Sequence, residues 1–125
     1  MLGNKKPMAT IAVRNLDAAR SFYEGRLGLM PDDHQEPGTV SYRSGDASLL
    51  VYPSQYAGSN LATAVTWTVG EELDETVRTL KSRGVVFEQY DFPDMVRDGD
   101  VHVMGPMRVA WFKDLDRNIH ALVNG

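Results

Sequence analysis

The sequence predicts an α+β fold of two tandem βαβββ units, whose strands form a curved mixed sheet around a concave cup with the helices outside. The first observation is a repeat. An alternating strand that includes Val13 precedes an amphipathic helix that stops at Gly28, and the same order recurs at the same spacing with Val69 and Gly84. The second is the closing stretch 108–123, in which β-branched and aromatic residues flank a turn of short polar side chains. Each unit has one apolar helix face that its strands must cover, which predicts helix-on-sheet layers.

The chain of 125 residues is long enough to form one hydrophobic core. We expect a single domain over residues 1–125. The first unit covers about 8–53 and the second about 63–124. Residues 54–62 are rich in Ser, Gly and Asn, and this composition predicts a linker between the units.

Within the first unit, the alternation of residues 8–14 predicts a strand. Asn15 offers helix-start chemistry, and apolar residues at helical spacing continue to Gly28, so a helix is expected between them. Residues 31–38 are polar and rich in turn formers, which predicts a loop. Strands at 39–43 and 47–52 follow, joined across a Ser-Gly-Asp turn.

The second unit begins with an alternating strand at 63–69. A helix is expected over about 71–83 and another strand over 85–90. Residues 91–105 combine Pro, Gly and scattered charges, and we expect an irregular loop there. The closing hairpin then completes the unit.

Composition excludes several classes of function. The net charge is −4, and the 13 Lys and Arg residues are scattered, so no basic surface for nucleic acid is expected. The chain has no cysteine, which excludes disulfides, a thiol nucleophile and Cys-based metal sites. No apolar run is long enough for a membrane span, and no signal-peptide pattern follows the first lysines. A cytoplasmic protein is the expectation.

Two motifs are similar to those of a known superfamily. The pattern Val-x-x-Leu-Asp…Phe-Tyr…Leu-Gly runs from Val13 to Gly28, and Ala-Trp-Phe-Lys-Asp-x-Asp-x-Asn occupies 110–118. Together with the repeated βαβββ unit they resemble the vicinal oxygen chelate superfamily. Its members include glyoxalase I, bleomycin-resistance proteins, fosfomycin-resistance enzymes and extradiol dioxygenases. One departure is that Leu115 and Arg117 replace the Pro and Gly that family members usually carry in the closing turn.

The resemblance implies where a divalent metal ion would be held in metal-dependent members. The implied ligand positions fall at Met8, Leu49 (or Leu50 if the register slips by one), Ala64 and Ala121. None of these side chains offers the nitrogen or oxygen that a divalent cation needs. We therefore expect a member of the superfamily that lacks the metal ligands, with no metal and no cofactor.

Other candidates for chemistry are weak. His34, His102 and His120 would have to converge from two loops and a strand to form a triad, and their roles stay open. The run Asp114-x-Asp116-x-Asn118 is similar to the start of a calcium loop but lacks its glycine and its closing glutamate, so a turn is the better interpretation. No nucleophile motif and no Gly-rich phosphate loop is present. The sequence leans against an enzyme.

The expected ligand site is the cup with a lid from the loop 91–107. Its lining is mostly apolar with a few hydroxyl groups, which suits a small apolar or aromatic molecule. The loop contributes methionines, which serve either as a lid or as fillers of a gap or dimer contact, and both alternatives stay open. The candidate ligand-binding residues are Met8, Thr10, Leu49, Ala64, Thr66, Thr68, Tyr90, Met95, Met104, Trp111 and Ala121.

Three functions are compatible with these observations. The first is metal-independent binding of a small molecule, as in the bleomycin-resistance members, which hold a drug between two protomers. The second is a metal-dependent glyoxalase-like lyase or isomerase, or a dioxygenase, and it rests on the resemblance alone. The third is a non-catalytic interaction or regulatory domain. A homodimer is expected, because the sheets would have free edges that can pair.

Overall fold

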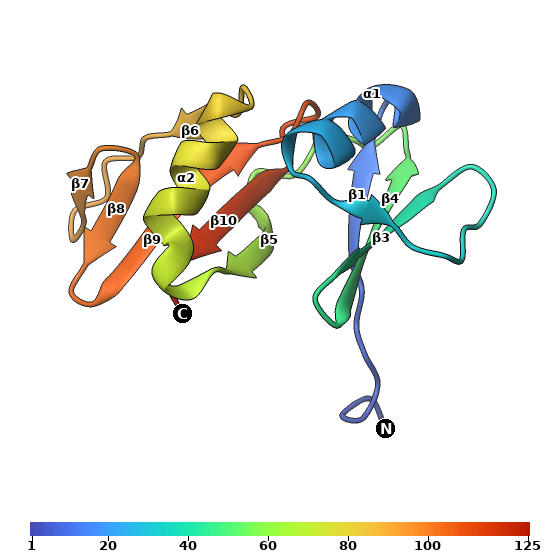
Figure 1. Ribbon diagram of the computed structural model, residues 1–125, viewed down its shortest axis with the longest axis horizontal. Helices are drawn as coiled ribbons and strands as arrows, with labels where there is room; N and C mark the ends of the chain where they lie inside the picture. Colours follow the sequence, from blue (N-terminus) through green and yellow to red (C-terminus); the bar gives the residue numbers. More distant parts are fainter.

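The computed structural model describes residues 1–125 and contains two sheets joined by a connecting segment (Figure 1). The first sheet has the order β1-β4-β3-β2 and consists of β1 (Ala9–Val13), β2 (Met30–Pro31), β3 (Val40–Ser44) and β4 (Ala47–Pro53). The second has the order β5-β10-β9-β8-β7 and consists of β5 (Thr63–Thr68), β7 (Val96–Asp98), β8 (Val101–Met104), β9 (Met107–Lys113) and β10 (Ile119–Val123), while β6 (Phe87–Glu88) pairs with β9.

In each half the first strand runs parallel to the last, β1 beside β4 and β5 beside β10. This repeated topology confirms the predicted α+β fold class. The strands do not form one continuous sheet, however. β1 and β5 are edge strands of separate sheets and share no ladder of hydrogen bonds.

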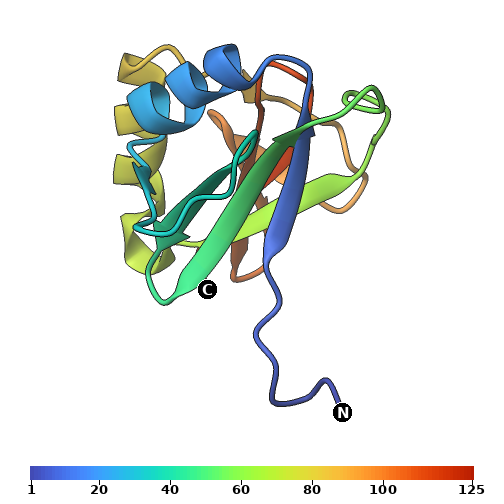
Figure 2. The ribbon, with the colours of Figure 1, turned by 90° about the vertical axis from the view of Figure 1, so that its right-hand side faces the viewer.

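Both helices lie on the same side of the strands (Figure 2). The helical residues are α1 (Leu16–Arg20) continuing into a π-helical turn (Ser21–Arg26), and α2 (Leu73–Ser82) after a 3-10 turn (Gly70–Glu72). The Asn15 side chain caps the first helix by accepting from the Ala18 N–H at 2.9 Å. Gly28 and Gly84 follow the two helices with φ of 72° and 90°, as the sequence predicts. Neither helix is long and apolar enough to cross a membrane.

The hydrophobic core fills the space between the helices and the sheets. Alternation along the strands decides which residues enter it: Ile11 and Val13 of β1 are buried, whereas Thr10 between them is exposed. In the second half, Ala110 and Phe112 of β9 belong to the same core cluster. The opposite side of each sheet has no helix over it, and we call this side the open face.

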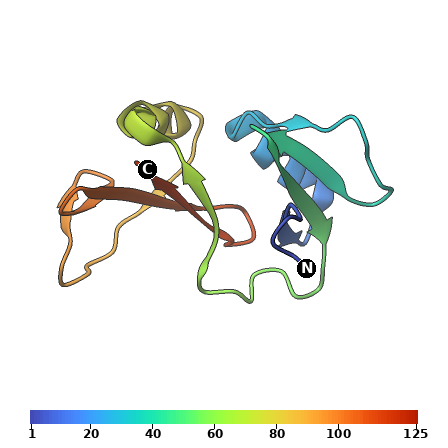
Figure 3. The same cartoon turned by 90° about the horizontal axis from the view of Figure 1, so that it is seen from below.

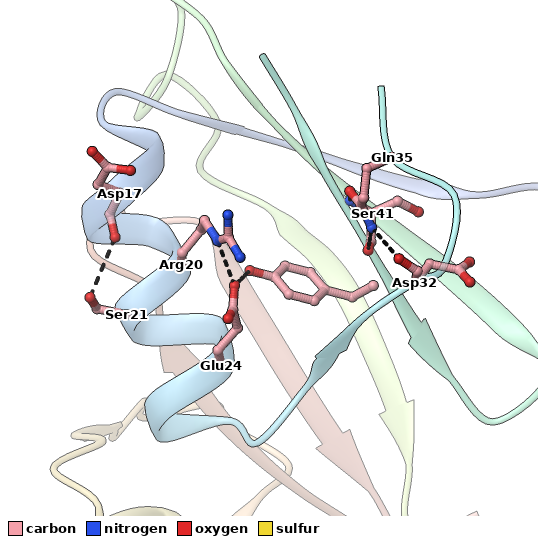
Figure 4. A network of polar contacts seen from close by, with 8 residues as sticks. Asp17, Arg20, Ser21, Glu24, Asp32, Gln35 and Ser41 are labelled. Atoms are coloured by element: carbon pink, nitrogen blue, oxygen red, sulfur yellow. Dashed lines mark hydrogen bonds and ion pairs between the residues drawn. The ribbon is translucent and has the colours of Figure 1, made fainter. Parts of the chain in front are cut away.

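A polar contact ties the first helix to the first sheet (Figure 4). Glu24 on the π-helical turn accepts from Arg20 at 2.7 Å and from the Tyr42 hydroxyl of β3 at 2.8 Å. The hydrogen bond from Arg20 and the one from Tyr42 keep the pKa of Glu24 below its usual value. The helix is therefore held over the sheet by this carboxylate as well as by its apolar face.

The prediction of an irregular loop over 91–105 was wrong in its second part. Residues 96–104 form the hairpin β7–β8, which extends the second sheet. Gly99, with φ of 64°, provides the tight turn, and the Asp-Gly pair at 98–99 is the signal for it. The strands are short and carry charges, so their alternation is weak. The predicted strand at 85–90 is also reduced to Phe87–Glu88.

Arg117, between β9 and β10, is the one residue other than glycine with a positive φ, 68°. A left-handed conformation costs a residue with a Cβ about 1–2 kcal/mol, and glycine avoids this cost. Part of the benefit is lost, because glycine has more conformational entropy to lose when the chain folds. We expect Arg117→Gly to raise the free energy of unfolding in urea by about 0.5–1 kcal/mol. Arg117→Ala is the control, since it removes the same side chain and keeps the Cβ. Equal stability of the two variants would contradict this account.

Candidate functional site

The turn between β9 and β10, residues 114–118, carries three buried polar side chains, Asp114, Asp116 and Asn118, and we call it the closing turn. One oxygen of Asp114, Oδ1, accepts from the backbone N–H groups of Asp116 at 2.9 Å and Asn118 at 2.8 Å. The other, Oδ2, accepts from the Tyr23 hydroxyl and the Asn118 amide, each at 2.8 Å. These carboxylate oxygens are used within the protein, which confirms the turn interpretation over the calcium loop.

The closing turn also holds the end of β1. The Asn118 amide donates to the Ala12 carbonyl at 2.8 Å, and Asp116 Oδ1 accepts from the Arg14 N–H at 3.1 Å. Asp116 and Asn118 are each 7% exposed. The two halves are therefore joined through buried hydrogen bonds, each with one donor and one acceptor.

His120 belongs to the same network on the helix side of β10. The Trp67 indole donates to its Nδ1 at 3.0 Å, so the neutral ring carries its proton on Nε2, which lies 3.0 Å from the Tyr23 oxygen. Tyr23 in turn donates to Asp114. Burial lowers the pKa of His120 to about 4, and it raises the pKa of Tyr23 together with the nearby Asp114 charge. Both ring nitrogens are occupied and the side chain is fully buried, so His120 is structural.

Replacing Tyr23 by Phe tests this network. The change removes one of the two donors to Asp114 Oδ2 and leaves the buried His120 Nε2–H without an acceptor, and we expect a loss of about 2–3 kcal/mol in the free energy of unfolding. Tyr42→Phe is the matched control. Its hydroxyl bonds Glu24, which is 31% exposed and keeps its bond to Arg20, and a loss of about 1 kcal/mol is expected. A smaller loss for Tyr23→Phe than for Tyr42→Phe would contradict the assignment.

The lowered pKa of His120 makes stability depend on pH. Between pH 6.5 and about 4 the unfolded chain binds a proton that the folded protein does not, so stability falls as the pH falls through this window. The full loss from this group is about 3 kcal/mol. Urea unfolding at several pH values checks it, with His120→Gln as the control that lacks the titrating ring. The variant should show a shallower decline over the same window, and parallel curves would contradict the prediction.

The positions implied for a metal ion do not fit one. The β1–β4 register pairs Thr10 with Leu50, which places Leu50 on the open face. Leu49, predicted to face the cup, instead lies on the helix side in the core at 3% exposure, because side chains alternate along β4. Correcting Leu49 to Leu50 leaves the same chemistry: a thioether and hydrocarbon side chains, which hold no divalent cation. No group of three or more His, Asp or Glu side chains is arranged to hold a metal ion.

The other predicted residues are spread over both sheets. Met8 and Thr10 are exposed at the start of the first sheet, and Ala64, Thr66 and Thr68 are exposed on β5. Ala121 is buried on the open side of β10, paired with Thr66 on one flank and Trp111 on the other. Met95 is half-buried and Met104 is exposed beside the turn into β9. The structure thus brings Thr66, Ala121 and Trp111 into one row across neighbouring strands.

The open face of the second sheet carries an aromatic cluster, formed by Tyr90, Phe92, His102 and Trp111. Trp111 is 5.3 Å from Tyr90, 5.7 Å from Phe92 and 4.9 Å from His102, measured between ring centroids. Tyr90 and Phe92 come from the connection between β6 and β7, residues 89–95, which passes on the side of the sheet opposite α2 (Figure 3). Tyr90 and Trp111 were predicted for the site. The position of His102 was not, because its strand was taken for a loop.

A crevice of about 690 Å³ separates the free edge of β5 from the first sheet. It is lined by Pro7, Ala9, residues 44–49 and residues 65–69. Thr66 and Thr68 border it, and so does Leu49 from the core side. The crevice follows from the division of the sheet, since β1 and β5 meet no partner strand there.

Comparison with solved structures shows the same fold in many proteins. A glyoxalase/bleomycin resistance protein/dioxygenase from Alicyclobacillus acidocaldarius is 18% identical, with 96% of this chain and 90% of that chain covered and a TM-score of 0.71. A bleomycin-binding protein complexed with bleomycin is 19% identical, with 98% and 99% covered and a TM-score of 0.71. The fosfomycin resistance protein FosX from Mesorhizobium loti is 14% identical, with 100% and 94% covered and a TM-score of 0.70.

No protein-family model matches the sequence, and no curated protein matches it. The structural likeness spans nearly the whole length of each chain and agrees with the motifs in the sequence. The chain has the vicinal oxygen chelate fold, shared with glyoxalase, bleomycin-resistance and dioxygenase superfamily proteins.

Proposed function

We propose that this protein binds a small apolar or aromatic molecule on the open face, without a metal ion. The aromatic cluster carries the proposal. It places flat rings on a sheet face that no helix covers, and Phe92 is 44% exposed at its edge. Aromatic side chains with one accessible face favour stacking on an aromatic ligand.

The chemistry around the cluster supports binding by burial and not by coordination. The positions where the resemblance implies metal ligands carry Leu50, Ala64 and Ala121, whose side chains have no nitrogen or oxygen, and Thr66 and Thr68 add hydroxyl groups on β5. A structural neighbour is described as a bleomycin-binding protein in complex with bleomycin. We propose that this chain, like that protein, binds a small molecule.

A second copy of the chain would complete the site. The free edges of β1 and β5 can pair with other strands. In a single chain, helices cover one side of each sheet and the open face has no helix over it. We therefore propose a homodimer in which the open faces of two copies enclose the ligand. A cytoplasmic protein agrees with the absence of cysteine.

The alternative is an enzyme that uses a metal, such as a glyoxalase-like lyase or isomerase, or a dioxygenase. The names of two structural neighbours, each a glyoxalase/bleomycin resistance protein/dioxygenase superfamily protein, support it. Elemental analysis of protein purified without a chelator distinguishes the two. Stoichiometric nickel, zinc, iron or manganese would favour the enzyme, as would loss of stability on chelation. If the protein binds no metal and no small molecule, and its open face binds only another protein, the result would favour a regulatory domain.

Thermal unfolding with a panel of aromatic compounds, including bleomycin, tests the proposal. A ligand at about 100 times its Kd stabilises the folded protein by about 2.7 kcal/mol, which raises the Tm by several degrees. We expect such shifts in the presence of a chelator, and we expect Trp111→Ala to abolish them. Trp67→Phe is the control, because Trp67 lies on the helix side of β5 and bonds His120. Shifts with divalent metals but with no organic compound would contradict the proposal.

A further inference from the structure

His102 holds a hydrogen-bond donor that nothing in the protein accepts. Its Nε2 accepts from the Tyr90 backbone N–H at 2.9 Å, so the neutral ring carries its proton on Nδ1. Nδ1 is the one buried side-chain nitrogen or oxygen of the chain with no hydrogen-bond partner, and the residue is 0% exposed. An unpaired buried donor costs about 1–3 kcal/mol, so folded proteins seldom keep one without a use.

The contrast with His120 is informative, since both histidines are fully buried in the second sheet. Both nitrogens of His120 are bonded, one by Trp67 and one by Tyr23. His102 has only the backbone of Tyr90. The first histidine is on the helix side and completes a structural network. The second is on the open face, within the aromatic cluster, and its network is incomplete.

The rings around His102 form a setting for a planar molecule. Trp111 meets it at an interplanar angle of 73° and Tyr90 at 37°. Phe92 packs against both of these rings, 5.6 Å from Tyr90 and 5.7 Å from Trp111. Phe92 therefore occupies the outer side of the cluster, where a flat ligand would stack on Trp111 and Tyr90.

Phe92 is weakly held. The ring is 44% exposed, and the connection that carries it has a local bond from the Met95 N–H to the Phe92 carbonyl at 3.2 Å. The Asp91–Arg97 ion pair is 3.6 Å long and its carboxylate is 91% exposed, so it contributes little. Moving Phe92 aside would break no buried hydrogen bond, whereas the Tyr90 N–H stays anchored on His102.

We propose that His102 selects the ligand: its Nδ1–H donates to an acceptor atom at the edge of a neutral planar aromatic molecule that displaces Phe92 from Trp111 and Tyr90. The acceptor is a ring nitrogen or a ring carbonyl oxygen. Asp91 and Asp94 on the same connection disfavour an anionic ligand. This inference rests on the proposed binding of aromatic molecules at the open face and adds the group that determines specificity.

Naphthalene and quinoline are matched probes, because they have the same shape and differ by one ring nitrogen. Titrations at pH 8, where quinoline is neutral, should show quinoline binding to the wild-type protein about tenfold more tightly, the gain expected when a buried unpaired donor finds its acceptor. In His102→Phe, which keeps an aromatic ring and removes the donor, quinoline should bind no more tightly than naphthalene.

Proton–nitrogen NMR of the histidine rings in the wild-type protein gives a second readout that does not depend on the folding of the variant. The His102 Nδ1–H resonance should shift with quinoline and not with naphthalene. Equal affinity for the two probes, or tighter quinoline binding with no shift at Nδ1, would overturn the role of His102 and leave the proposed function standing. Binding of neither probe would overturn both.

Discussion

The carboxylate of Asp114 is the group on which the assembly of the two halves depends. It is 6% exposed and has no cation beside it, so its charge is stabilised only by the hydrogen bonds it accepts from Tyr23, Asp116 and Asn118. Two of these donors shape the closing turn, and the third comes from the first helix. A buried charge held in this way permits one geometry, because losing any donor leaves the carboxylate short of a partner. The turn and the helix therefore fix each other.

This constraint sets the relation between the sheets. The closing turn anchors the end of β1 through the Ala12 carbonyl and the Arg14 N–H, while Tyr23 reaches across to His120 on β10. β1 and β5 share no hydrogen bonds, so the side chains of the turn and the core carry the contact that a continuous sheet would otherwise provide. Both helices consequently lie on one side, and both open faces are left available (Figure 2).

The second sheet thus has two sides of different character. On the helix side, Trp67, Tyr23 and His120 satisfy one another, and burial keeps the histidine neutral. On the open side, Trp111 packs against His102 and against Tyr90 and Phe92 of the connection between β6 and β7, and one nitrogen of His102 stays unpaired. Folding free energy explains the first arrangement. The unpaired nitrogen of the second arrangement lowers stability and supports no other contact in the protein. Ligand binding is expected at sites of this kind.

The sequence by itself determined the fold class, the helix limits and the closing turn, because these depend on local patterns: alternation in strands, an apolar helical stripe, an Asn cap and glycines after each helix. It placed Tyr90 and Trp111 among the candidates through their residue type alone. Only the tertiary structure decided that Leu49 enters the core and Leu50 the open face, since a register shift of one residue exchanges the two sides of a strand. It also decided that His120 has partners on both ring nitrogens and His102 on only one. Local sequence patterns do not reveal hydrogen-bond partners that lie far apart in the chain.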